Sequence, residues 1–108
     1  MKWPKKHTKN LVYRSLMNTT PKSEEQIANA AISLAVKKEF YEFDSEQNLE
    51  AILTNLDSKD QNHIIEAVKE VVKDLTDKEL LKVYPDTTVS LTTDGISYVL
   101  SRVPKNYF

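Results

Sequence analysis

The spacing of apolar residues changes abruptly near the C-terminus, and this change constrains the fold more than any other feature. Two short runs alternate apolar with polar residues, which is typical of strands that bury one face. Their apolar members are Leu81, Val83, Val89 and Leu91. Between them, Pro85-Asp86 indicates a turn, because proline fixes φ and aspartate can bond its own backbone. The spacing predicts a hairpin near 80–84 and 88–92.

From Ile96 onward the apolar spacing becomes three and four residues, which is one face of a helix. Ile96, Val99, Leu100 and Val103 share this face. Thr92 or Thr93 can cap such a helix, which we predict near 93–103. The alternative takes Asp94-Gly95 as a hairpin turn that leads into a strand from Ile96.

Upstream of the hairpin, the pattern predicts four helices near 10–18, 23–42, 45–56 and 58–75. Capping-box pairs precede three of them. These pairs are Ser23 with Gln26, Asp44 with Gln47, and Ser58 with Gln61. A fourth such pair, Thr76 with Glu79, begins one more helical turn or the approach to the first strand. The predicted fold class is mainly α with a small β-hairpin, an α+β arrangement.

The residues expected in the core follow the same periodicities. They are Ile27, Ala31, Leu34, Leu49, Ile52, Leu53, Ile64, Val68, Val71, Leu75, Leu81, Val83, Leu91, Val99 and Leu100.

Charge is distributed unevenly along the 108 residues, although the net charge is −1. Residues 1–22 carry six lysines and arginines and no acid, whereas residues 23–108 carry nine bases and sixteen acids. A basic segment on an acidic body favours contact with nucleic acid or an acidic partner. The alternative is a solvated tail. We therefore divide the chain into a basic N-terminal arm with a short helix, 1–22, and a domain, 23–108.

The amino-acid composition excludes several classes of protein function. There is no cysteine, which excludes disulfides and thiolate chemistry. No apolar run reaches the roughly 20 residues of a membrane span, and a cytoplasmic protein is expected. Only two histidines occur, His7 and His63, without a second ligand three or four residues away, so no metal or other cofactor is expected. No nucleophile elbow or glycine-rich loop is present, so the chain is not expected to be an enzyme.

The order of elements in residues 23–103 resembles a winged helix-turn-helix domain. The helices at 45–56 and 58–75 would form the helix-turn-helix. In the second of them the matching residues are Ile64, Ala67, Val68, Val71 and Leu75. The segment Leu80-Leu81-Lys82-Val83-Tyr84 is similar to the entry into the wing, and Val89-x-Leu91-Thr92-x-x-Gly95 to its exit.

Two departures from the winged-helix pattern matter. Glu79 stands where the family commonly has glycine, and the wing loop carries Asp86 but no base. Winged-helix domains bind DNA or other proteins, so the resemblance alone does not decide between these functions.

The resemblance and the basic arm together predict a small transcriptional regulator that binds duplex DNA. Lysines would hold phosphates, and amide side chains can pair with adenine edges. The candidate residues are Lys5, Lys6, Lys9, Lys59, Gln61, Asn62 and Lys69. A homodimer, formed through the N-terminal helix, would combine the weak affinities of two DNA half-sites. The alternative is a protein-interaction module of the same fold, with no catalytic role.

Overall fold

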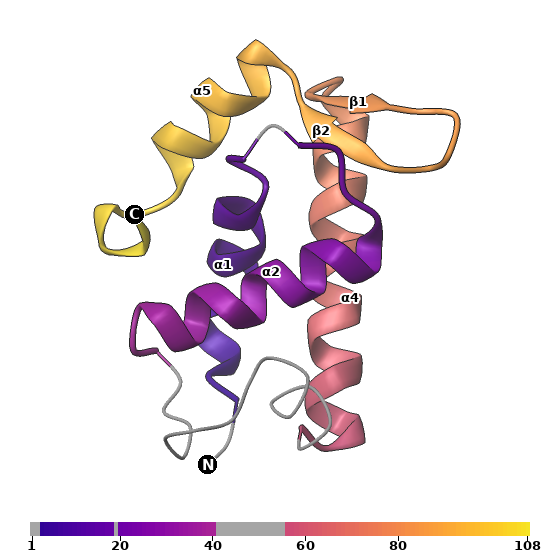
Figure 1. The fold of residues 1–108 in the computed structure, drawn as a ribbon. Coiled ribbons are helices and arrows are strands. Elements are labelled where there is room, and N and C mark those ends of the chain that lie inside the picture. The colour runs from indigo at the N-terminus through magenta and orange to yellow at the C-terminus, as the bar shows by residue number, and fades with distance from the viewer. Residues whose placement is uncertain (1–2, 19, 41–55) are drawn as a thin grey trace.

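The computed structural model describes residues 3–18, 20–40 and 56–108. In this part of the chain, helices pack around one core, and a two-stranded antiparallel hairpin projects beyond it (Figure 1). The protein is therefore mainly helical with a small sheet, as predicted. The predicted helix at 45–56 and the Asp44–Gln47 capping box lie outside the described residues, apart from Leu56.

The N-terminal segment is folded onto the core. A 3₁₀ turn, η1 (Lys5–His7), leads into α1 (Thr8–Ser15), two residues earlier than predicted. Trp3 is buried, and its indole Nε1 donates to the Thr8 hydroxyl at 2.7 Å. The same hydroxyl lies 3.1 Å from Nε2 of His63. The basic charges of residues 5–14 therefore sit on an ordered surface rather than a solvated tail.

Helix α2 (Glu24–Lys37) begins as its sequence predicts. The Ser23 hydroxyl accepts from the Gln26 amide, and the Gln26 side chain accepts from the Ser23 amide, so the capping box is present. The helix ends five residues before the predicted position 42. Glu39, with φ of 61°, turns the chain in the left-handed region, and its amide bonds to the carbonyl of Val36.

Helix α4 (Ser58–Asp77) is capped one residue earlier than predicted. The Asp57 carboxylate accepts from the Asp60 amide, so the Ser58–Gln61 capping box is wrong. At the other end, Thr76 is still helical. Glu79 has φ of 59° and ends the helix, so this segment does not begin a new turn capped by Thr76. Glu79 occupies the left-handed position that glycine usually takes at a helix C-terminus.

The hairpin consists of β1 (Leu81–Val83) and β2 (Val89–Leu91), with Lys82 opposite Ser90. Lys22, between α1 and α2, pairs with Val89 on the other side of β2 through two backbone hydrogen bonds of 2.8 and 2.9 Å. This pairing ties the hairpin to the helical core.

Helix α5 (Thr93–Arg102) follows directly, with Thr92 as its N-cap. The alternative with an Asp94-Gly95 turn and a strand is therefore wrong. Gly95 is required here because a Cβ would lie 2.4 Å from the carbonyl oxygen of Leu80. That carbonyl accepts from both the amide and the hydroxyl of Thr92, which binds the start of α5 to the start of the hairpin.

The C-terminal 3₁₀ turn, η2 (Lys105–Tyr107), returns to the N-terminal side of the molecule. Tyr107 is buried, and its ring stacks on Phe40 at 4.9 Å. Nδ1 of His7 lies 2.6 Å from the Tyr107 hydroxyl. These contacts close the chain ends together near the C-terminal end of α2.

The observed core agrees with the prediction for most residues of α2 and α4, and two predicted core residues elsewhere are exposed. Val83 and Leu100 were expected inside, but they are 63% and 55% exposed. Leu34 and Leu81 are only half-buried, while Leu49, Ile52 and Leu53 lie outside the described residues. The prediction omitted Trp3, Leu11, Val12, Tyr13, Leu16, Val103 and Tyr107, all of which are buried.

Candidate nucleic-acid interface

The outward face of α4 carries three of the predicted site residues. Positions three or four residues apart share one side of a helix. On α4 the exposed positions of this kind include Lys59, Asn62, Glu66, Lys69 and Lys73, and the acidic Asp77, four residues after Lys73 at the end of the helix, is exposed on the same side. Lys59, Asn62 and Lys69 were predicted; Lys73 was not, although it follows Lys69 by four residues. We call the five residues Lys59, Asn62, Glu66, Lys69 and Lys73 the outward face.

Gln61 lies on a different side of α4 from Asn62. Its Nε2 donates to the carbonyl oxygen of Leu56 at 2.8 Å, which holds the side chain at the start of the helix. Gln61 also lines a groove between α2 and α4, next to Glu24 and Glu25. The two amides predicted to act as a pair therefore face different surroundings.

The three N-terminal lysines lie on the opposite side of α4 from that groove. Lys5, Lys6 and Lys9 line a recess of about 190 Å³ between the N-terminal segment and α4. Glu66 and Glu70 line the same recess. Lys9 forms an ion pair with Glu70 at 3.0 Å, with both side chains largely exposed. An exposed ion pair of this kind adds little stability. The carboxylate of Glu70 nevertheless offsets part of the positive charge of Lys9.

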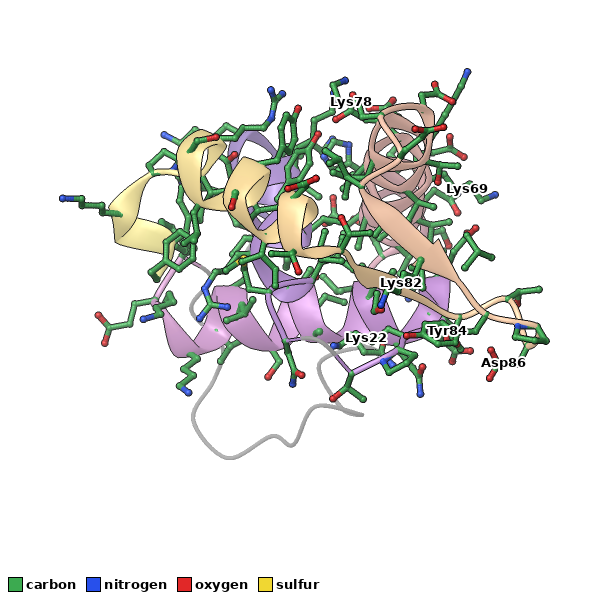
Figure 2. All side chains as sticks on the ribbon, turned by 90° about the horizontal axis from the view of Figure 1, so that it is seen from above. Lys22, Lys69, Lys78, Lys82, Tyr84 and Asp86 are labelled. Carbon is green, nitrogen blue, oxygen red and sulfur yellow. The ribbon has the colours of Figure 1, made fainter. Side chains whose placement is uncertain are left out.

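The hairpin adds a lysine that the sequence analysis did not select. Lys82 projects from β1 opposite Ser90, and the Tyr84 hydroxyl lies 3.2 Å from the Ser90 hydroxyl. Figure 2 shows Lys82 and Tyr84 on the hairpin and Lys69 on α4. Period-two alternation could have identified Lys82, because it lies between two apolar strand residues.

The tip of the hairpin is acidic. Hydrogen bonds from the hydroxyl and the amide of Thr88 hold the pKa of Asp86 below its usual value. Asp86 therefore remains charged, and the tip itself offers no cation. Lys22 lies beside the hairpin and donates to the carbonyl oxygens of Asn18 and Thr20, while burial lowers its pKa.

The described residues contain no group of three histidine or acidic side chains placed to hold a metal ion. In the same part of the chain, no helix is long and apolar enough to cross a membrane.

The architecture defines a small helical domain with a two-stranded antiparallel hairpin, compatible with a winged-helix-like layout. Comparison with known proteins finds no family model, no curated protein and no solved structure that matches this chain. The function must therefore be argued from the surfaces described above.

Proposed function

We propose that this chain is a winged-helix domain that binds duplex DNA, with the outward face of α4 in the major groove. The observation that supports this most is the position of the hairpin. It begins directly after α4 and projects on the side of α4 that faces away from α1 (Figure 1). A helix that enters the major groove could then be flanked by the hairpin along the phosphate backbone.

The chemistry of the outward face supports the same proposal. Lys59, Lys69 and Lys73 can neutralise phosphates, and the Asn62 amide can pair with an adenine edge. Lys5 and Lys6 lie beside α4 and extend the basic surface. Glu66 opposes it, so affinity should be modest for one copy and rise with a second half-site.

The test is an anisotropy titration of labelled duplex DNA at low and moderate salt. Binding should weaken as salt increases, because each phosphate contact releases a counterion. Replacing Lys69 and Lys73 by alanine should weaken binding to all duplexes. The slope of the logarithm of the binding constant against the logarithm of salt concentration should become shallower by about two, roughly one for each lysine. Asn62→Ala should reduce the preference among sequences without changing the salt slope.

Lys105→Ala is the matched control. Lys105 is exposed on η2, which lies far from the hairpin in Figure 1, and its removal lowers the charge without touching the proposed surface. Equal losses in Lys105→Ala and Lys69→Ala would indicate non-specific attraction. If the intact protein has no duplex affinity at low salt, the DNA proposal is wrong and the protein-interaction module replaces it.

A homodimer is part of this proposal, because two copies would place two α4 helices on neighbouring half-sites. The apolar residues Leu11, Val12 and Leu16 are already buried in the core. A dimer contact on α1 would have to use its outward residues instead. Light scattering with and without a palindromic duplex would give the stoichiometry.

A further inference from the structure

The groove between α2 and α4, in the described part of the chain, is a mainly apolar recess that the proposed DNA surface does not use. It has a volume of about 450 Å³ and lies where α2 crosses α4 (Figure 1). Its floor and walls are mainly aliphatic. The apolar lining residues are Ala28, Ile32, Ile64, Ile65 and Val68. Ile65 is 42% exposed although it is a large β-branched residue, so part of the groove is open to solvent.

The shape of the groove suits a helix. Its α2 wall is formed by two rows of residues four apart, Glu24, Ala28 and Ile32 with Glu25 and Asn29 beside them, and its α4 wall extends from Gln61 to Val68. Eight residues of helix rise about 12 Å, so the groove is roughly two turns long. An amphipathic helix presents apolar side chains at this spacing, and helices bind other proteins by placing such a stripe in an apolar groove.

The charges at the groove identify the partner more closely. Among the described lining residues, Glu24 and Glu25 are acidic and none is basic. Both are exposed in the first turn of α2. Asn62 and Lys69 of the outward face lie three and four residues from Ile65 on α4, but neither is in the groove lining. A ligand with cations next to its apolar stripe would therefore find complementary charge here.

We propose that the α2–α4 groove binds an amphipathic helix of another protein that carries lysine or arginine beside its apolar stripe. Aliphatic residues of that helix would cover Ile65, the exposed apolar side chain of the groove, and its cations would face Glu24 and Glu25. This inference goes beyond DNA binding and does not depend on it, because none of the five outward-face residues lines the groove, although Asn62 and Lys69 adjoin Ile65 on α4.

The test uses two labelled synthetic peptides of equal length with the same leucine stripe at helical spacing. Lysines flank the stripe in one peptide, and glutamates flank it in the other. The lysine peptide should bind the full chain, and the glutamate peptide should bind at least about tenfold more weakly. Because the pairing is electrostatic at an exposed rim, higher salt should narrow this difference.

Two variants locate the binding site. Ile65→Ser should weaken the lysine peptide at least about tenfold, since one aliphatic contact is lost. Glu24→Gln combined with Glu25→Gln should leave leucine-dependent binding but abolish the preference for lysine. Leu100→Ser is the matched control, because Leu100 is an exposed aliphatic residue on α5, outside the groove. Circular dichroism would show that every variant keeps its helices.

Three outcomes would overturn the proposal. The first is no binding of either peptide. The second is equal binding of both, or equal losses in Ile65→Ser and Leu100→Ser. The third is self-association that Ile65→Ser abolishes, which would assign the groove to a second copy of this chain.

Discussion

The Tyr13 hydroxyl donates to Oδ2 of Asp74 at 2.7 Å and joins two helices whose residues are 61 positions apart. The Tyr98 hydroxyl donates to the same oxygen at 3.3 Å, so α1, α4 and α5 meet at one carboxylate. Lys78 pairs with the other oxygen. The Arg102 guanidinium lies over the Tyr13 ring at 5.1 Å. This cluster holds α5 and the N-terminal segment on the same side of α4.

Tyr13→Phe should destabilise the protein by about 1–3 kcal/mol, the range for losing a hydrogen bond to a charged group. Tyr13 is buried, so water cannot readily replace the hydroxyl. The free energy of unfolding in urea measures the effect. Tyr84→Phe is the comparison, because it removes a hydroxyl that lies 3.2 Å from the uncharged Ser90 hydroxyl on the more exposed hairpin. Equal effects of the two substitutions would show that the Tyr13–Asp74 bond contributes no more than this neutral contact.

The stabilisation from Asp74 should depend on pH. Hydrogen bonds from Lys78 and then Tyr13 hold the pKa of Asp74 below its usual value in the folded protein. Between the folded and unfolded pKa values the unfolded chain binds more protons, so the stabilisation is present above the unfolded pKa and is lost as the pH falls through the folded pKa. Asp74→Asn should therefore destabilise the protein by a constant amount above about pH 5, and the difference should shrink in more acidic solution.

Urea titrations of the native protein and Asp74→Asn across this range would measure the difference. The Asp86→Asn variant provides the comparison, because Asp86 also has a lowered pKa but lies on an exposed turn. If the difference in free energy of unfolding between the native protein and Asp74→Asn grew as the pH fell, ionised Asp74 would not be the source of the stabilisation.

Gly95→Ala should destabilise the protein by about 1–3 kcal/mol, as expected when a well-packed site is overfilled. The new Cβ would lie 2.4 Å from the Leu80 carbonyl oxygen, and this atom belongs to the backbone. Helix propensity alone favours alanine over glycine by about 1 kcal/mol, so the sign of the change distinguishes the two effects. Thermal unfolding gives the measurement. Ser97→Ala, at an exposed position of the same helix, should be close to neutral.

Glu79→Gly should stabilise the protein by about 1 kcal/mol, because a left-handed backbone costs a non-glycine residue roughly 1–2 kcal/mol. The midpoint of urea unfolding should rise. Glu66→Gly makes the same substitution in the middle of α4, where the backbone is right-handed. It should lower the free energy of unfolding by about 1 kcal/mol. A decrease in both variants would mean that Glu79 makes a stabilising contact that outweighs the strain.

Capping signals were reliable where one residue could act and ambiguous where two could. Ser23 caps α2 as expected. At α5 the sequence offered both Thr92 and Thr93, and Thr92 is the cap. At α4, Asp57 and Ser58 are adjacent and both are good caps, and the choice depends on where the chain leaves the core. Leu56 is buried immediately before this cap, which is a tertiary constraint that no local rule contains.

The candidate site also combines features that local sequence predicts with features that it does not. Lys59, Asn62 and Lys69 were candidates because of their charge or amide chemistry, and the structure places them on one side of α4. Gln61 was grouped with Asn62 because both carry amides at the start of the helix. Adjacent helical residues point about 100° apart, so Gln61 faces the α2 groove while Asn62 faces outward.

For the described residues, the sequence by itself predicted the order of helices and strands, the turn at Pro85-Asp86 and, in preference to a strand, the helix that follows Thr92, because these depend on periodicity and capping within a few residues. Only the tertiary structure decided that the basic N-terminal segment folds onto α4, where Trp3 and His63 meet at Thr8. It also decided that Val83 and Leu100 stay exposed. An apolar side chain can be buried, but its burial requires a surface to pack against, and that surface is formed by residues far away in the chain.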